Sequence, residues 1–330
     1  MQIDFPHRHA GHCESGVTAN LLSHQGLHLS EPMALGLSSA LVFAHFPFMR
    51  WGGIPMTAYR MFPGAVIKGV AKQTGVKIAE ERFKDRAAAK AALDAHLAAG
   101  RPVALRTNVY WLPYFPPDMR FHFNAHNIVA IGRDGDDYLV SDPVFEDIQR
   151  CDPEGLEKAR FSLGPFAPKG LIYYPTEVPA RWDPAKAIPK ALKRTYNVMN
   201  RTPLPWVGLG TIHRLARTLR KLEGQPEKAE YSRQLVGSII RMQEEIGTGG
   251  GGFRFMYAAF LQEAAELLQR ENLAKAADEM TEAGDVWREF ALLGARYVRQ
   301  KRAPALSQLA ECMERAAAQE GKVYPRLKHG

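Results

Sequence analysis

The chain has 330 residues, of which 46% are apolar and 24% are charged. This is the composition of an ordinary folded protein, and it excludes disordered, collagen-like and disulfide-rich classes. Because a single core stops growing at roughly 250 to 300 residues, the length predicts two domains. The three cysteines lie far apart, the N-terminus has no apolar signal segment, and no run of about 18 apolar residues occurs. These features predict a soluble, cytoplasmic protein with reduced thiols and no membrane span.

The net charge of +8 is confined to the second part of the chain. Residues 1–180 carry 18 basic and 18 acidic side chains, whereas residues 181–330 carry 25 and 17. Ten of the basic residues lie between Arg181 and Lys221, where Asp183 is the single acid. Such a segment is typical either of a solvated surface or of a docking site for an acidic partner. The sequence lacks zinc-finger spacing, an RNP-like motif and a basic zipper, so we do not expect nucleic acid as the partner.

Helix signals dominate the first hundred residues. Cys13 lies where a loop becomes a helix, and Gly26 is a natural stop for that helix. Ser30 is a good N-cap and Pro32 a good first-turn residue for the next helix. The spacing of apolar residues predicts helices over 17–26, 29–46, 64–75 and 85–100, with a strand at 76–83.

Strand signals follow. Residues 102–112 are β-branched and aromatic, and 126–143 contain two apolar runs around Asp134-Gly135-Asp136, a strong hairpin signal. A last strand is expected at 170–175. Helices followed by antiparallel strands predict an α+β domain over residues 1–176.

Beyond a Pro-rich linker at 177–190, three-four spacing of apolar residues indicates helix throughout. Long helices are expected near 231–246, 253–268 and 273–297, so residues 191–330 should form an all-α helical bundle. The glycine-rich run at 247–252 lacks the Lys-Ser/Thr ending of a P-loop and has no strand before it. We interpret it as a mobile loop between helices.

The residues that could carry chemistry are Cys13, His126 and Asp142. A thiol at a helix start feels the positive end of the helix dipole, which favours the thiolate. His126 opens one strand of the predicted hairpin and Asp142 follows the other, so antiparallel pairing can bring imidazole and carboxylate together. Each residue alone has an ordinary structural explanation, but the arrangement is the one that a papain-like nucleophile site requires.

The chain resembles the butirosin biosynthesis protein H family. The segments HRHAGHCES, NLLSHQGLHLSEPMALGLSSAL and AHNIVAIGRDGDDYLVSDPVF are similar to its N-terminal domain, and GTGGGGFRFMYAAFLQEAAELL is similar to the helical domain that often follows. The order Cys, His, Asp-Pro is more distantly similar to the bacteriocin-processing cysteine peptidases. The resemblance implies a papain-like fold and acyl transfer from a carrier-protein thioester to an amine, with Cys13, His126 and Asp142 at the catalytic positions.

One position departs from the peptidase pattern. Those enzymes carry an oxyanion-binding glutamine six residues before the cysteine, where this chain has His7. An imidazole can donate to an oxyanion, so His7 is a candidate for that role. His7, His9, His12 and Cys13 could alternatively be a zinc site, although no second Cys/His cluster completes it. We therefore expect no metal.

The sequence thus predicts a cysteine acyltransferase of specialised metabolism. Cys13 would take an acyl group from a carrier thioester and pass it to a small-molecule amine or hydroxyl, or within one molecule as a cyclisation. No cofactor of its own is expected, because the substrate would arrive on the phosphopantetheine arm of an acyl carrier protein docked on Arg181 to Lys221. Two alternatives remain open: a cysteine peptidase or amidase with the same triad, and a catalytically inactive binding protein.

Overall fold

The structure is a computed structural model that describes residues 2–329. Its contacts divide the chain into two compact units, and each unit is built from two separate segments of the sequence. The first comprises Met1–Ala34 and Pro63–Trp182, and the second comprises Leu35–Phe62 and Asp183–Gly330. The terminal residues Met1 and Gly330 lie outside the described part.

A six-stranded antiparallel sheet organises the first unit, with the strand order β3-β8-β4-β5-β6-β7. Its strands coincide with the four regions in which strands were predicted, and β7 is an additional short edge strand. The bounds are Lys77–Glu81 (β3), Val103–Thr107 (β4), His126–Asp134 (β5), Asp137–Ser141 (β6), Gln149–Cys151 (β7) and Ile172–Glu177 (β8).

Helices cover both faces of this sheet. Cys13–His24 (α1) and Ala65–Thr74 (α3) pack on one face, and Arg86–Ala98 (α4) and Pro153–Arg160 (α5) pack on the other. Alternate residues of β5 enter opposite cores, since Val129 packs with α1 whereas Ile128 packs with α4 and α5. The first unit therefore has the papain-like α+β fold that the sequence predicts.

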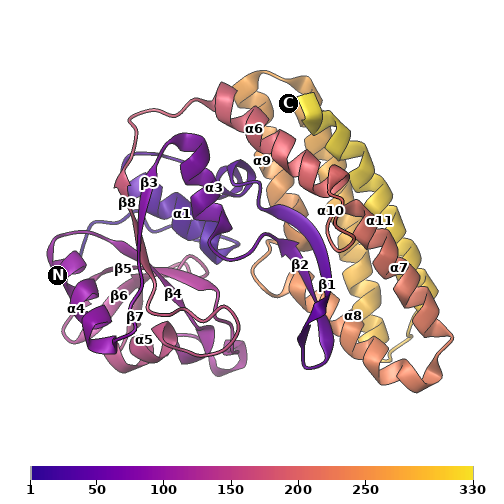
Figure 1. The fold of residues 1–330 in the computed structure, drawn as a ribbon, viewed down its shortest axis with the longest axis horizontal. Helices are drawn as coiled ribbons and strands as arrows, with labels where there is room; N and C mark the ends of the chain where they lie inside the picture. Colours follow the sequence, from indigo (N-terminus) through magenta and orange to yellow (C-terminus); the bar gives the residue numbers. More distant parts are fainter. Residues whose placement is uncertain (1, 330) are drawn as a thin grey trace. The chain divides into compact units, whose positions relative to one another are not determined.

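The second unit is a bundle of helices together with a two-stranded hairpin (Figure 1). Helix α11 lies along both α7 and α10, and α9 lies along α10. Helices α8, α9 and α10 confirm the three helices predicted there. The bounds are Pro184–Tyr196 (α6), Leu209–Glu223 (α7), Ala229–Glu244 (α8), Arg254–Leu268 (α9), Glu271–Val298 (α10) and Leu306–Arg326 (α11). Across residues 2–329, no helix combines the length and hydrophobicity that crossing a membrane requires.

The helix predicted over 29–46 is wrong in its second half. Helix α2 covers only Glu31–Leu37, and the chain continues as the hairpin Leu41–Trp51 (β1) and Ile54–Arg60 (β2). Ser39 ends the helix by adopting a left-handed conformation, with φ of 54°. Phe43 of β1 stacks on Trp287 at 5.5 Å between ring centroids, which places the hairpin in the helical unit. Local apolar spacing cannot reveal this, because the partner is about 240 residues away in the sequence.

Two other expectations are corrected at the junction and in the bundle. Asp183 caps α6, so helix begins inside the segment expected to be a Pro-rich linker. The glycine run at 247–252 is packed rather than mobile: the Gly251 N–H donates to Glu244 at 3.1 Å. A Cβ on Gly252 would lie 2.2 Å from the Tyr59 ring, so the glycines are needed for close packing.

Candidate active site

Cys13 is the first residue of α1 and is buried. The N-cap is His12, whose Nδ1 accepts a hydrogen bond from the Ser15 N–H at 3.2 Å. The carboxylate of Glu31 accepts hydrogen bonds from the N–H groups of Gly11 at 2.9 Å and His12 at 2.7 Å. It therefore holds the backbone that leads into the helix. Burial raises the pKa of Glu31, against the lowering effect of these hydrogen bonds.

A second buried carboxylate, Glu14, follows Cys13 directly. Its Oε1 accepts the N–H groups of Gly64 at 3.0 Å and Val66 at 2.9 Å, which lie at the start of α3. The carboxylate satisfies backbone donors that a helix leaves unpaired at its N-terminus. The sequence analysis missed both glutamates, because an acid in a first helical turn is usually an ordinary surface feature.

The register of the β5–β6 hairpin decides which face of the sheet Asp142 occupies. Near the turn, Gly132 pairs with Leu139, but beyond a bulge Val129 pairs with Ser141. This register puts Asp142 opposite Ile128, on the same face as His126 two residues earlier. Without the one-residue shift Asp142 would lie opposite Val129, on the other face.

The structure brings His126 and Asp142 into direct contact. His126 Nε2 lies 2.7 Å from Asp142 Oδ2, and both side chains are buried. Burial alone would lower the pKa of His126, but the charge and hydrogen bond of Asp142, with a smaller effect of Cys13, raise it from 6.5 to about 10. Because Nε2 is bound to Asp142, Nδ1 is left for the hydrogen bond with Cys13. The imidazolium form of His126 is thus favoured at neutral pH.

Other groups hold the Asp142 carboxylate in place. The Tyr114 hydroxyl donates to Oδ2 at 3.0 Å, and the Val144 N–H donates to Oδ1 at 3.2 Å. The ring of Phe115 meets His126 edge to face, with centroids 5.5 Å apart. Both carboxylate oxygens therefore have defined partners, which fixes the orientation of the imidazole.

A further polar group near the sulfur is Asn127, which the sequence analysis did not single out. Its Nδ2 donates to the Ala125 carbonyl at 3.0 Å and lies 3.9 Å from Cys13 Sγ. Its Oδ1 accepts the Tyr173 hydroxyl at 3.0 Å, which fixes the amide orientation. Asn127 follows His126 in β5 and points to the α1 face, so strand alternation is the one sequence signal that could have identified it.

His7, the candidate oxyanion donor, makes its hydrogen bonds with residues on either side of Asp142. Its Nδ1 lies 2.8 Å from Ser141 Oγ and its Nε2 lies 2.9 Å from the Glu146 carbonyl oxygen. Both ring nitrogens therefore already have partners in the strand region that precedes and follows Asp142. His12 is likewise bound to Ser15. Within residues 2–329 no three His, Cys, Asp or Glu side chains are grouped so as to hold a metal ion.

The remaining cysteines are in different environments. Burial is the main cause of a raised pKa in both thiols. The pKa of Cys151 lies above its ordinary value, and that of Cys312 is raised to about 11. Both thiols are buried, and neither faces a histidine–carboxylate pair among the contacts described. They provide internal references for the reactivity of Cys13.

A helix that begins at a cysteine, packed on an antiparallel sheet whose hairpin presents a joined His–Asp pair, defines a papain-like domain. Comparison with known families agrees with this class. The family model "Butirosin biosynthesis protein H, N-terminal" matches residues 12–143, and "Domain of unknown function (DUF4872)" matches residues 154–327. The second of these models covers just over half of the chain, which therefore belongs to the DUF4872 family, and residues 12–143 are similar to the N-terminal domain of butirosin biosynthesis protein H.

Comparisons with individual proteins add less. No curated protein matches the chain. A solved structure described as a C39-like peptidase, from Bacillus anthracis, is 18% identical, with a TM-score of 0.37; the match covers 54% of this chain and 92% of that one.

Proposed function

We propose that this protein is a cysteine acyltransferase in which Cys13 is the nucleophile, His126 the general acid and base, and Asp142 the residue that orients and charges His126. The observation that carries the proposal is the buried contact of 2.7 Å between His126 and Asp142, beside a cysteine at a helix start. The similarity of residues 12–143 to a biosynthetic protein supports transfer to an acceptor rather than cleavage of a protein.

The first half of the reaction loads the enzyme. The Cys13 thiolate bonds to the carbonyl carbon of an acyl thioester, and negative charge develops on the carbonyl oxygen near the N-terminus of α1, whose dipole stabilises it. The bond between that carbon and the donor sulfur then breaks. The departing thiolate receives the proton held by His126, and an acyl group remains on Cys13.

The second half transfers the acyl group. His126, now neutral, takes a proton from an amine or hydroxyl as its nitrogen or oxygen bonds to the same carbon. Cys13 leaves as the thiolate and the original charge state returns. Asp142 stays ionised throughout and stabilises the imidazolium, which is present at the start of the cycle and forms again when His126 takes the proton of the acceptor.

The donor is proposed to be a thioester on the phosphopantetheine arm of an acyl carrier protein. All ten basic residues between Arg181 and Lys221 are exposed, on or beside α6 and α7. In α7, Arg214, Arg217 and Lys221 recur at helical spacing and all three are exposed. An acidic carrier is the partner that such a surface would attract.

The test measures the reactivity of each thiol. Iodoacetamide should alkylate Cys13 at least about tenfold faster than Cys151 or Cys312, because only Cys13 faces an imidazolium. Short acyl thioesters of pantetheine should leave one acyl adduct on Cys13, detected by mass spectrometry of tryptic peptides. Cys13→Ala should show no adduct on either remaining cysteine.

Two further measurements separate transfer from its alternatives. Added amines should release the adduct as amide faster than water releases it as acid, whereas a peptidase or amidase would cleave peptides without any thioester. Equal alkylation of the three cysteines, in protein that is folded by circular dichroism, would instead point to a binding protein on an inactive scaffold. That result would refute the acyltransferase.

A further inference from the structure

A second site lies in the first unit, away from Cys13, between α4 and α5. A cavity of about 290 Å³ opens there against the ring of Tyr138 in β6. Its cationic lining residues are Arg86 and Lys90 from α4 and Arg160 from the end of α5. None of the proposed catalytic residues lines it. This volume approaches the lower end of the range for small-molecule sites.

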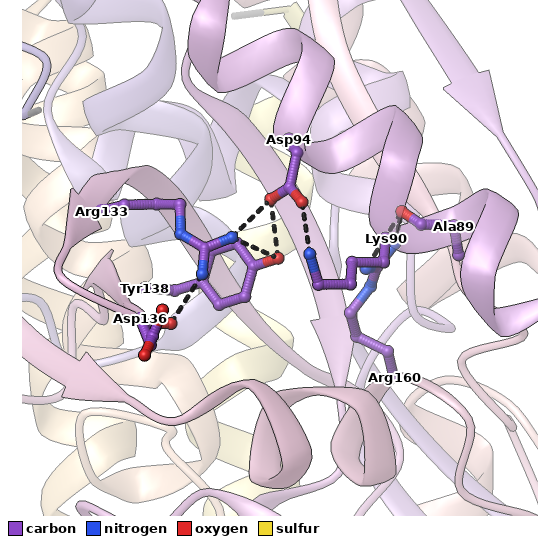
Figure 2. Close-up of polar contacts among 7 residues, drawn as sticks. All are labelled: Ala89, Lys90, Asp94, Arg133, Asp136, Tyr138 and Arg160. Atoms are coloured by element: carbon purple, nitrogen blue, oxygen red, sulfur yellow. Dashed lines mark hydrogen bonds and ion pairs between the residues drawn. The ribbon is translucent and has the colours of Figure 1, made fainter.

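Arg160 is the unusual member of this group, because its cation is buried without a carboxylate partner. The side chain is 3% exposed, and both terminal nitrogens share the Ala89 carbonyl oxygen, at 3.3 and 3.2 Å (Figure 2). Its Nε has no hydrogen-bond partner, and no ion pair found within residues 2–329 includes Arg160. Burial lowers the pKa of Arg160 to about 10, although Tyr138, Asp94 and Glu157 partly oppose this. A buried charge that lacks a counter-ion is costly.

The acids that line or neighbour the cavity are bound to other cations, and Glu154 is paired with Lys158 at 2.6 Å. Asp94 receives Lys90 at 2.6 Å, Arg133 at 3.0 Å and the Tyr138 hydroxyl at 2.7 Å, as Figure 2 shows. Glu157 is paired with Arg86 at 3.0 Å. None of these acids lies within ion-pair distance of Arg160, so a bound anion could supply the direct counter-charge that the chain does not.

We propose that this cavity binds a small organic anion, with its carboxylate or phosphate group on Arg160 and its apolar body against Tyr138. A guanidinium recognises both groups through paired N–H donors. Lys90 and Arg86 also line the cavity, each beside the acid with which it pairs, and Leu156 and Phe161 are apolar lining residues. The site does not depend on the chemistry of Cys13, so it would hold a regulator or an accessory ligand rather than the acyl group.

Isothermal titration calorimetry on the full chain tests the site with phenyl phosphate, phenylacetate and inorganic phosphate as probes. One probe anion should bind with a stoichiometry of one, and the tighter of phenyl phosphate and phenylacetate identifies the anionic group. Arg160→Met should weaken binding at least about tenfold, which corresponds to about 1.4 kcal/mol. The exposed Arg82→Met removes the same charge outside the cavity and should bind as the wild type does.

Several outcomes would overturn the site. These are the absence of saturable heat with all three probes, unchanged binding in a folded Arg160→Met variant, or equal weakening in Arg82→Met. If Arg160→Met does not fold, the double variant Arg86→Met/Lys90→Met decides, since both side chains are about half exposed. Wild-type affinity in that variant would refute the proposal. Cys13→Ser should bind the probe normally, so the result is independent of the acyltransferase.

Discussion

We expect Asp142 to stabilise the protein, in addition to its proposed role in orienting His126. The pKa of His126 is raised from 6.5 to about 10 in the folded state. Burial lowers this pKa, and the charge of Asp142 is the largest of the effects that raise it. A raised folded pKa means that folding favours the protonated ring. Its contribution to stability is complete below pH 6.5 and is lost as the pH rises through about 10.

Asp142→Asn should therefore flatten the pH dependence of stability. The free energy of unfolding in urea should be lower than in the parent at pH 6, and the two curves should converge toward pH 10. The parent for this comparison is Cys13→Ser, because a thiol that titrates together with His126 would obscure the result.

Asp94→Asn is the matched control for this measurement. Its carboxylate also accepts a tyrosine hydroxyl, but its cation partners are Lys90 and Arg133 instead of a histidine. The pKa of Asp94 is lowered, mainly by hydrogen bonds and charges that outweigh its burial, so any linked stability change falls at acidic pH. If the free energies of unfolding of Asp142→Asn and its parent changed in parallel between pH 6.5 and 10, Asp142 would not be the residue that raises the pKa of His126.

At the scale of secondary structure, the contact between α1 and the segment after β6 positions the proposed nucleophile relative to Asp142. The Ala10 N–H donates to the Pro143 carbonyl at 2.7 Å. A Cβ on Gly16, in the first turn of α1, would lie 2.6 Å from Ala10 Cβ and 2.8 Å from Pro143 Cβ. Only glycine allows this approach, so α1 can lie close enough for Cys13 to reach the hairpin.

Gly16→Ala should destabilise the protein by about 1–3 kcal/mol, the usual cost of overpacking. The direction of this stability change is informative, because replacing glycine by alanine inside a helix ordinarily stabilises a protein by about 0.5–1 kcal/mol. Acylation of Cys13 should also slow, since the helix has to move away from Pro143. Urea unfolding and the rate of adduct formation measure the two effects.

Gly321→Ala in α11 is the control, because nothing lies within 4 Å of the added Cβ. It should leave acylation unchanged and stability unchanged or higher. If Gly16→Ala behaved in the same way, the close contact at Pro143 would not position Cys13.

How much of this arrangement could be predicted depends on how local its signals are. The β5–β6 hairpin and the helix at Cys13 were predictable, because the turn residues and the apolar spacing that indicate them lie within about ten consecutive residues. The bulge that puts Asp142 on the His126 face was not, nor was the contact of His7 with Ser141. The bulge is a register shift inside the hairpin that turn residues and apolar spacing do not reveal. The contact of His7 with Ser141 depends on distant segments, and the same holds for β1, whose partner Trp287 belongs to α10.

For the whole molecule, the distribution of charge suggests how a carrier would be recruited. The excess of basic residues lies entirely in residues 181–330. Two of the basic residues in α7 already have defined contacts: Arg220 pairs with Glu314, and Arg214 donates to the Pro205 carbonyl at 2.8 Å. Changing these two would alter the bundle itself, so a test of docking should use other exposed cations.

Reversal of four exposed charges should weaken the use of a carrier-bound donor while the fold is kept. The variant combines Lys190→Glu, Lys193→Glu, Arg217→Glu and Lys221→Glu. We expect KM for the carrier-bound thioester to rise at least about tenfold, and the same acyl group on free pantetheine to react as before, because rim charges mainly set the encounter rate. Raising the salt concentration should reproduce the defect in the wild type, since exposed charges are screened over about 10 Å at 0.1 M ionic strength. Equal loss with both donors would indicate damage to the helical unit, and no loss with either would show that α6 and α7 present only a solvated basic surface.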